Sequence, residues 1–238
     1  MPIFFFLNQL IKQLYKNLVM KLAIFNGSPR GLTSNTNTLL QYFQRGFEDS
    51  GGEIASVDYL IKEKELKSQV EHFRGAANIL LAFPLYVDSV PGIVKQFIEE
   101  IGNFDGSGKN IIFFVHSGFP EAIHSDGLVC YLELLAKRWN MNHVGTILKP
   151  GTEQIRMRPK KKNEDLFQDF EQLGRALAQS GSLDQKILAR FRKLYLFPKN
   201  IVPIIRMISK LGVFDKYWKK ELKKNKAYAR NFDAPLLD

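Results

Sequence analysis

The stretch KLAIFNGSPRGLTSNTN, residues 21–37, passes from a short apolar run into a loop of glycine, hydroxyl and amide side chains. The run over residues 21–26 has the pattern of a buried strand, and Gly27 and Pro29 end it. Apolar residues with helical spacing then follow over residues 35–49: Leu39, Leu40, Phe43 and Phe47. A strand, a polar loop and a helix in this order are typical of the first unit of an α/β fold.

The same alternation continues to about residue 180. The apolar patterns predict four further strands over residues 53–59, 78–83, 109–115 and 143–148, and four further helices over residues 66–74, 93–101, 126–140 and 163–179. Interleaved strands and helices imply parallel pairing with right-handed crossovers. The sequence therefore predicts a three-layer αβα sandwich around a five-stranded parallel sheet.

Composition excludes several classes of protein. The 238 residues are 45% hydrophobic, which is enough for a core. The single cysteine, Cys130, excludes a disulfide framework and fits a reducing, cytoplasmic location. The four histidines have no metal-ligand spacing, so no metal site is expected.

The net charge of +10 is concentrated at one end of the chain. Residues 184–238 hold fourteen Lys and Arg against five Asp and Glu, whereas the other 183 residues are nearly balanced. No nucleic-acid-reading motif accompanies this charge, so nucleic acid is not an expected partner. We predict three parts: an N-terminal extension over residues 1–19 that could be helical, an α/β domain over 20–182, and a basic helical appendage over 183–238.

Three loops of unusual composition follow the first, third and fourth predicted strands: residues 27–37, 84–92 and 116–121. In an open parallel sheet with strand order 2-1-3-4-5, these loops line the crevice where ligands bind. We therefore expect the three loops to form one site.

The first loop precedes the N-terminus of a helix, where unpaired N–H groups and a partial positive charge attract anions. Hydroxyl groups at Ser28, Ser34 and Thr36 add donors, and Arg30 adds a charge. The loop has neither the Gly-Lys-Ser/Thr sequence of an ATP loop nor the GxGxxG of a dinucleotide loop, which favours the phosphate of a mononucleotide. The alternative is that these side chains only cap the helix.

The second and third loops offer groups suited to a flat ring. Tyr86 has an apolar face, and Gly118 allows close approach of a ligand to the main chain. A rigid turn carrying a surface tyrosine is the alternative interpretation of the second loop. His116 and Tyr86 are weak candidates for a catalytic role, although a lone histidine at a strand end is more often structural.

These motifs resemble those of a known family. Gly27-Ser28-Pro29-Arg30 with Ser34-Asn35-Thr36, then Pro84-Leu85-Tyr86 with Pro91-Gly92, are similar to the NADPH-dependent FMN reductases and related NAD(P)H-dependent oxidoreductases of the flavodoxin-like superfamily. The resemblance covers residues 20–180 and implies a flavodoxin-like fold, FMN and a homodimer. It implies a phosphate site of Ser28, Arg30, Ser34, Asn35 and Thr36, and a ring site of Pro84, Leu85, Tyr86, Val87, Ser117, Gly118 and Phe119.

The resemblance implies that hydride passes from NADPH or NADH to FMN and then to a small acceptor, such as a quinone, a flavin, a nitro or azo compound or an iron chelate. The sequence does not choose among these acceptors. Two alternatives remain: a flavodoxin-type electron carrier, and an interaction module that has kept the fold. The second rests on the basic appendage, whose helices could contact a membrane surface.

Overall fold

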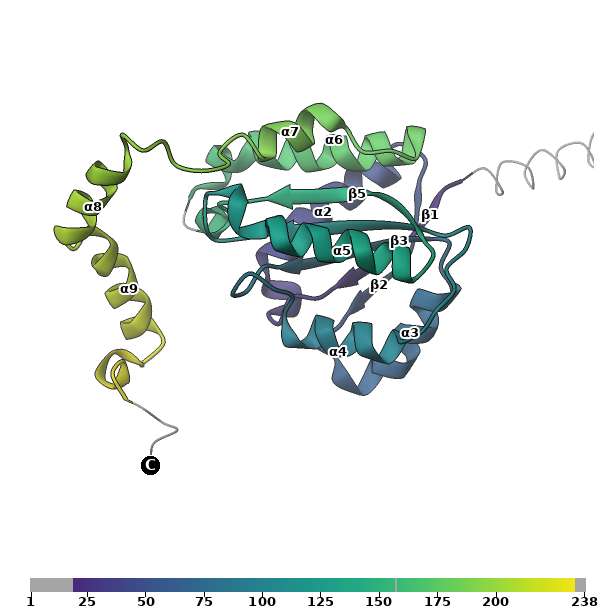
Figure 1. Cartoon of the computed structure of the whole chain (residues 1–238), viewed down its shortest axis with the longest axis horizontal. Helices are drawn as coiled ribbons and strands as arrows, with labels where there is room; N and C mark the ends of the chain where they lie inside the picture. The colour runs from purple at the N-terminus through teal and green to yellow at the C-terminus, as the bar shows by residue number, and fades with distance from the viewer. Residues whose placement is uncertain (1–18, 157, 234–238) are drawn as a thin grey trace, which may run out of the picture. The chain divides into compact units, whose positions relative to one another are not determined.

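The computed structural model describes residues 19–156 and 158–233, and its centre is a five-stranded parallel sheet (Figure 1). The strand order is β2-β1-β3-β4-β5, and every neighbouring pair is parallel. The strands are β1 (Lys21–Asn26), β2 (Glu53–Tyr59), β3 (Asn78–Pro84), β4 (Asn110–His116) and β5 (Asn142–Lys149). The predicted topology is confirmed.

Helices cover both faces of the sheet. One face packs against α2 (Asn35–Glu48), α6 (Glu164–Ser180) and α7 (Gln185–Phe191). The other face packs against α3 (Leu66–Gly75), α4 (Gly92–Ile101) and α5 (Asp126–Arg138). Short 3-10 turns complete this part of the chain: Gly31–Thr33, Glu63–Glu65, Ala122–Ser125, Glu153–Arg156 and Lys160–Asn163. The result is the three-layer sandwich that the sequence predicts.

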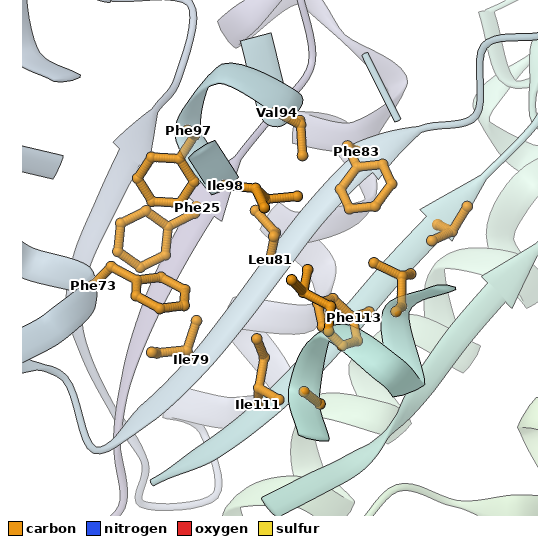
Figure 2. Packing of buried hydrophobic residues seen from close by; sticks show 14 of the residues in the cluster. Phe25, Phe73, Ile79, Leu81, Phe83, Val94, Phe97, Ile98, Ile111 and Phe113 are labelled. Carbon is orange, nitrogen blue, oxygen red and sulfur yellow. The ribbon is translucent and has the colours of Figure 1, made fainter. Parts of the chain in front are cut away.

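Burial on both faces explains why the central strands are apolar without interruption. In β3, Leu81 and Phe83 point into the core beneath α3, α4 and α5, while Leu80 and Ala82 point into the core beneath α2 and α6. Phe73 of α3 packs in the first core with ring contacts to Phe25 and Phe97 (Figure 2). Its ring also contacts Phe104 and Trp139.

The helices α2 and α6 approach each other closely because two glycines meet at their crossing. A Cβ on Gly46 would lie 1.9 Å from the carbonyl oxygen of Glu171, and a Cβ on Gly174 would lie 2.0 Å from that of Phe43. Any side chain at either position would force the two backbones apart. Since α2 begins at the first of the three polar loops, this crossing also positions that loop.

Contacts divide the chain into two units between Tyr195 and Leu196. Helix α7 belongs to the first unit, because Leu183, Ile187 and Phe191 are buried in the core beneath α2 and α6. The second unit contains α8 (Val202–Lys210), α9 (Val213–Lys224) and the turn Tyr228–Arg230. The predicted domain boundary after residue 182 is not tested by this division and stays a prediction.

The predicted N-terminal extension lies, apart from residue 19, outside the described residues. In the part of the chain that the structure describes, no helix is long and apolar enough to cross a membrane.

Candidate functional site

The three polar loops meet at the carboxyl edge of the sheet, where they line a pocket together with the loop that follows β5. The enclosed volume is about 70 Å³, which suits a phosphate-sized group, so a larger ligand would extend through the open side. The lining residues are Ser28, Arg30, Ser34, Asn35, Pro84, Leu85, Tyr86, His116, Ser117, Gly118, Thr152 and Glu153.

The first loop turns into α2 through a capping serine. The Ser34 hydroxyl accepts a hydrogen bond from the Asn37 N–H at 2.9 Å and donates to the Gly31 carbonyl at 2.6 Å. The capping alternative therefore describes Ser34 correctly. The cap also anchors the first turn of α2, and the N-terminus of a helix attracts anions through its partial positive charge.

Two residues at the start of this loop offer donors to the pocket. The Ser28 side chain is buried, and its Oγ accepts a long hydrogen bond, 3.4 Å, from the Arg30 N–H. Arg30 itself is exposed at the pocket rim. Next to them, Asn26 accepts from the Ser28 N–H through Oδ1, while its buried Nδ2 has no partner among the described residues.

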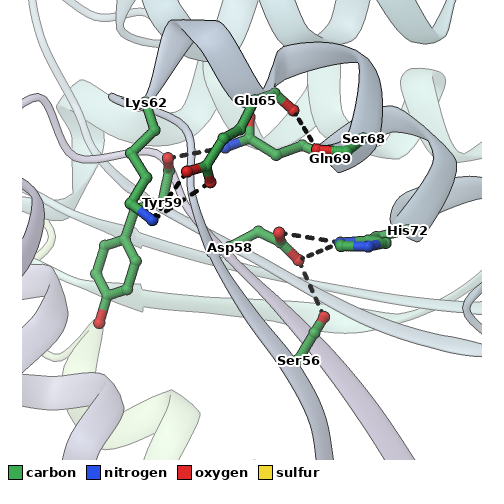
Figure 3. Close-up of polar contacts among 8 residues, drawn as sticks. All are labelled: Ser56, Asp58, Tyr59, Lys62, Glu65, Ser68, Gln69 and His72. Carbon is green, nitrogen blue, oxygen red and sulfur yellow. Dashed lines mark hydrogen bonds and ion pairs between the residues drawn. The ribbon is translucent and has the colours of Figure 1, made fainter.

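The neighbouring strand β2 supports the first turn of α2. The Tyr59 hydroxyl donates to Oδ1 of Asn37 at 2.8 Å. Gln69 of α3 donates to the Tyr59 carbonyl at 2.9 Å, and Asp58 pairs with His72 beside it (Figure 3). These contacts fix the end of β2 against α3, and through Tyr59 they hold the amide of Asn37 in place.

The second loop is a tight turn in an unusual backbone conformation. Tyr86 and Ser89 exchange two backbone hydrogen bonds of 3.0 Å each, and the residues between them, Val87 and Asp88, have φ of 48° and 57°. Positive φ at both central positions is the geometry of a type I′ turn, which favours Asn and Gly. A rigid turn with a surface tyrosine was the alternative interpretation of this loop, but its positive φ angles could not be predicted because neither residue is a glycine. The turn leaves Tyr86 exposed beside the pocket.

The third loop begins with a buried histidine that joins three elements. His116, the last residue of β4, lies with Nε2 2.7 Å from the Thr36 hydroxyl of α2 and with Nδ1 2.8 Å from the Thr152 hydroxyl beyond β5. The Thr152 hydroxyl donates to the Ser117 carbonyl at 3.0 Å. Its only proton is thus committed, so Thr152 accepts from Nδ1–H of His116, and Nε2 of His116 accepts from Thr36.

This histidine is neutral at physiological pH. Burial, with a smaller contribution from the positive charge of Lys149, lowers the pKa of His116 to about 3. Both ring nitrogens are occupied by the threonines. His116 therefore holds the site together and is not placed to exchange protons with a ligand.

The structure brings most of the predicted site residues together, with three exceptions. The Thr36 hydroxyl is buried against His116 and is not part of the pocket wall. Thr36 could therefore contact a phosphate only through its backbone N–H. Val87 is 96% exposed, and Phe119 stacks at a tilt on His124. Thr152 and Glu153 also line the pocket and were not among the predicted site residues, although their position after the strand next to β4 was a signal for them.

Comparison with known proteins fits this geometry. A family model, Flavodoxin_2, described as a flavodoxin-like fold, matches residues 20–177, well over half of the chain. The chain belongs to this family. The matched range contains the three polar loops and Thr152. No curated protein matches the sequence significantly.

Solved structures share the fold of this Flavodoxin_2 member. An FMN-dependent NADH-azoreductase from Bacillus anthracis, solved with FMN, has a TM-score of 0.53 at 12% identity and covers 68% of this chain and 100% of its own. An NADH:FMN oxidoreductase in its apo form has a TM-score of 0.54 at 18% identity, and the match covers 68% of this chain and 91% of the oxidoreductase. An NADPH-quinone reductase from P. pentosaceus has a TM-score of 0.51 at 16% identity, and the match covers 68% of this chain and 99% of the reductase. At these identities the likeness shows the fold.

Proposed function

We propose that this chain is an FMN-dependent NAD(P)H oxidoreductase. The observation that carries the proposal is the single pocket formed by the loops after β1, β3 and β4, with phosphate donors at the first turn of α2 and an exposed tyrosine beside it. Three solved neighbours that share this fold are, by their descriptions, FMN- or nicotinamide-dependent reductases.

The donor set fits the phosphate of FMN. Ser28, Arg30 and Asn35 line this volume of phosphate size, where the Ser28 hydroxyl, the Arg30 guanidinium and the N-terminus of α2 would donate to the phosphate. A dianion at this point would offset the positive charge of Arg30 and of the helix N-terminus.

The second and third loops would border the flavin ring. Pro84, Leu85 and Tyr86 provide an apolar wall on one side, and Ser117 and Gly118 provide main chain on the other. When bound, FMN supplies the redox chemistry: it takes up hydride from a reduced nicotinamide and passes electrons to an acceptor. The chain's own residues bind and orient these molecules, and the hydrogen bonds of His116 hold the loops of the pocket in position.

The remaining features of the function rest on the resemblance for the homodimer, on the single cysteine for the location and on local charge for the nicotinamide. We propose a homodimer in the cytoplasm that reduces a small acceptor of the quinone, flavin, nitro, azo or iron-chelate classes. The basic run over residues 156–162, with Arg158 exposed, would favour NADPH through its 2′-phosphate. A solvated helix entry remains the alternative interpretation of that run.

Titration with FMN and then with reduced nicotinamide tests the proposal. Purified protein should bind FMN with flavin absorption bands, and anaerobic NADPH or NADH should bleach them. Arg30→Ala should weaken FMN binding about tenfold, which is the loss of one charge-assisted contact. Arg175→Ala, an exposed arginine on α6, should leave it unchanged.

Two outcomes would contradict the proposal. A protein that binds no FMN would refute the flavin site. A protein that binds FMN but is not bleached by either nicotinamide would instead support the electron-carrier alternative.

A further inference from the structure

The second unit of the chain, residues 196–233 of the described part, lies outside the flavodoxin-like match. The family model ends at residue 177, and the neighbours above cover 68% of this chain while matching 91–100% of their own. The pocket described above draws no residue from this unit. Its function therefore needs a separate explanation.

Helix α8 presents an exposed apolar stripe. No residue of α8 is buried. At 100° per residue, six apolar side chains fall within an arc of about 160°. Four of them are exposed, by 37–69%: Ile201, Ile204, Met207 and Leu211. Ile205 and Ile208, toward one side of the arc, are only partly exposed. Among the described residues of this unit, these four side chains are left largely uncovered.

Cations lie beside the stripe. Arg206 and Lys210 line one open groove together with Met207. On α9, five lysines fall within an arc of about 140° at helical spacing: Lys216, Lys219, Lys220, Lys223 and Lys224. Residues 196–238 hold ten Lys and Arg against four Asp and Glu, a net charge of +6. The α8 surface thus joins apolar side chains to cations within a positively charged unit, so an occupant that is both apolar and negatively charged fits it.

We propose that α8 and α9 dock the protein peripherally on an anionic lipid bilayer. An amphipathic helix that lies in the bilayer interface combines this apolar stripe with flanking cations, and the cations are attracted to anionic headgroups. A nucleic acid would use the cations but not the exposed stripe. A nine-residue helix is only about 14 Å long, so α8 lies on the membrane rather than crossing it. This docking is independent of the flavin site.

Tryptophan fluorescence of the full chain gives a direct test. Trp139 is buried in the sheet domain, whereas Trp218 of α9 is 62% exposed. Vesicles of phosphatidylcholine with added phosphatidylglycerol should shift the emission to the blue and should sediment the protein. Pure phosphatidylcholine vesicles should bind about tenfold more weakly, and salt near 1 M, where the Debye length is about 3 Å, should release the protein.

Matched variants separate the stripe from the charge. The triple variant Ile204→Ser, Met207→Ser, Leu211→Ser should lose vesicle binding about tenfold or more, whereas Leu134→Ser, an equally exposed leucine on α5, should not. The pair Lys219→Glu, Lys220→Glu should weaken binding to anionic vesicles only, and Lys64→Glu, Lys67→Glu in the sheet domain is the control. All these positions are exposed, so the variants should fold, which circular dichroism verifies.

Three results would overturn the proposal. The first is no blue shift and no sedimentation with anionic vesicles. The second is a stripe variant that changes only the oligomer mass in gel filtration, which would assign the stripe to a second copy of the chain. The third is binding to duplex DNA that anionic vesicles do not compete away, which would assign the cations to nucleic acid.

Discussion

Nε2 of His116 lies 2.7 Å from the hydroxyl of Thr36, which ties the end of β4 to the first turn of α2 beneath the candidate pocket. The two residues are eighty positions apart in the chain, and both are buried. The hydrogen-bond chain continues through Thr152 to the Ser117 carbonyl. One buried hydrogen-bond chain thus joins the loops that follow three strands. The carbonyl at its end can only accept, and this sets the direction of donation along the chain.

Removing the Thr36 hydroxyl should lower the free energy of unfolding but should have little effect on the affinity for FMN. Thr36→Val keeps the shape of the side chain but leaves Nε2 of His116 buried without a donor, at a cost of about 1–3 kcal/mol in the free energy of unfolding. Thr36→Ser keeps the donor and should cost less than about 1 kcal/mol. Urea denaturation measures both. An FMN affinity that drops in Thr36→Val more than in Arg30→Ala would show that the hydroxyl contacts the phosphate after all.

The buried His116 should make stability fall in acid. Its pKa of about 3 in the folded chain lies below the value near 6.5 of an unfolded histidine, so below pH 6.5 only the unfolded state takes up the proton. The contribution of neutral His116 to the free energy of unfolding is complete above pH 6.5. It is lost as the pH falls toward 3, by up to about 1.4 kcal/mol per pH unit.

Denaturation of His116→Gln from pH 7 to pH 4.5 isolates this contribution. The variant is less stable at pH 7, but its stability should decline less steeply than that of the wild type. Equal slopes for wild type and His116→Gln would contradict the assignment of a neutral, buried imidazole.

The glycine crossing of α2 and α6 should not tolerate a methyl group. Gly174→Ala places a Cβ 2.0 Å from the Phe43 carbonyl oxygen, and the forced separation should destabilise the protein by about 2–3 kcal/mol. Gly127→Ala in α5, where nothing lies within 4 Å, should instead stabilise by about 0.5–1 kcal/mol. Thermal denaturation of the two variants measures the contrast, and similar melting temperatures would show that the helices can separate freely.

The strained turn after Tyr86 should relax with residues that accept positive φ. The pair Val87→Asn, Asp88→Gly should raise the free energy of unfolding by about 1–2 kcal/mol, because the β-branched Val87 is costly at φ of 48°. Ser89→Gly in the same loop relieves no positive φ and should be neutral or slightly destabilising. Urea denaturation distinguishes the two, and a destabilised double variant would show that Val87 makes a stabilising contact in this loop.

The sequence by itself determined the strands, the helices and the edge of the sheet that carries the site. The apolar runs of β3 and β4 are local patterns whose meaning does not depend on distant residues, and parallel winding then brings the loops after β1, β3 and β4 to one edge. The predicted strand bounds agree with the structure within one residue for this reason. Ser28, Arg30 and Tyr86 were found at the pocket on the same grounds.

Only the tertiary structure decided how the polar groups of the site are used. Whether the Thr36 hydroxyl faces a ligand or His116 depends on a partner 80 residues away in sequence. Whether His116 is charged depends on its burial between that hydroxyl and Thr152, 36 residues further along the chain. The same holds for Gly46 and Gly174, whose role appears only where α2 and α6 cross. Hydrogen bonds and steric contacts act over a few ångströms, so they are set by the packing of elements that the local pattern cannot place.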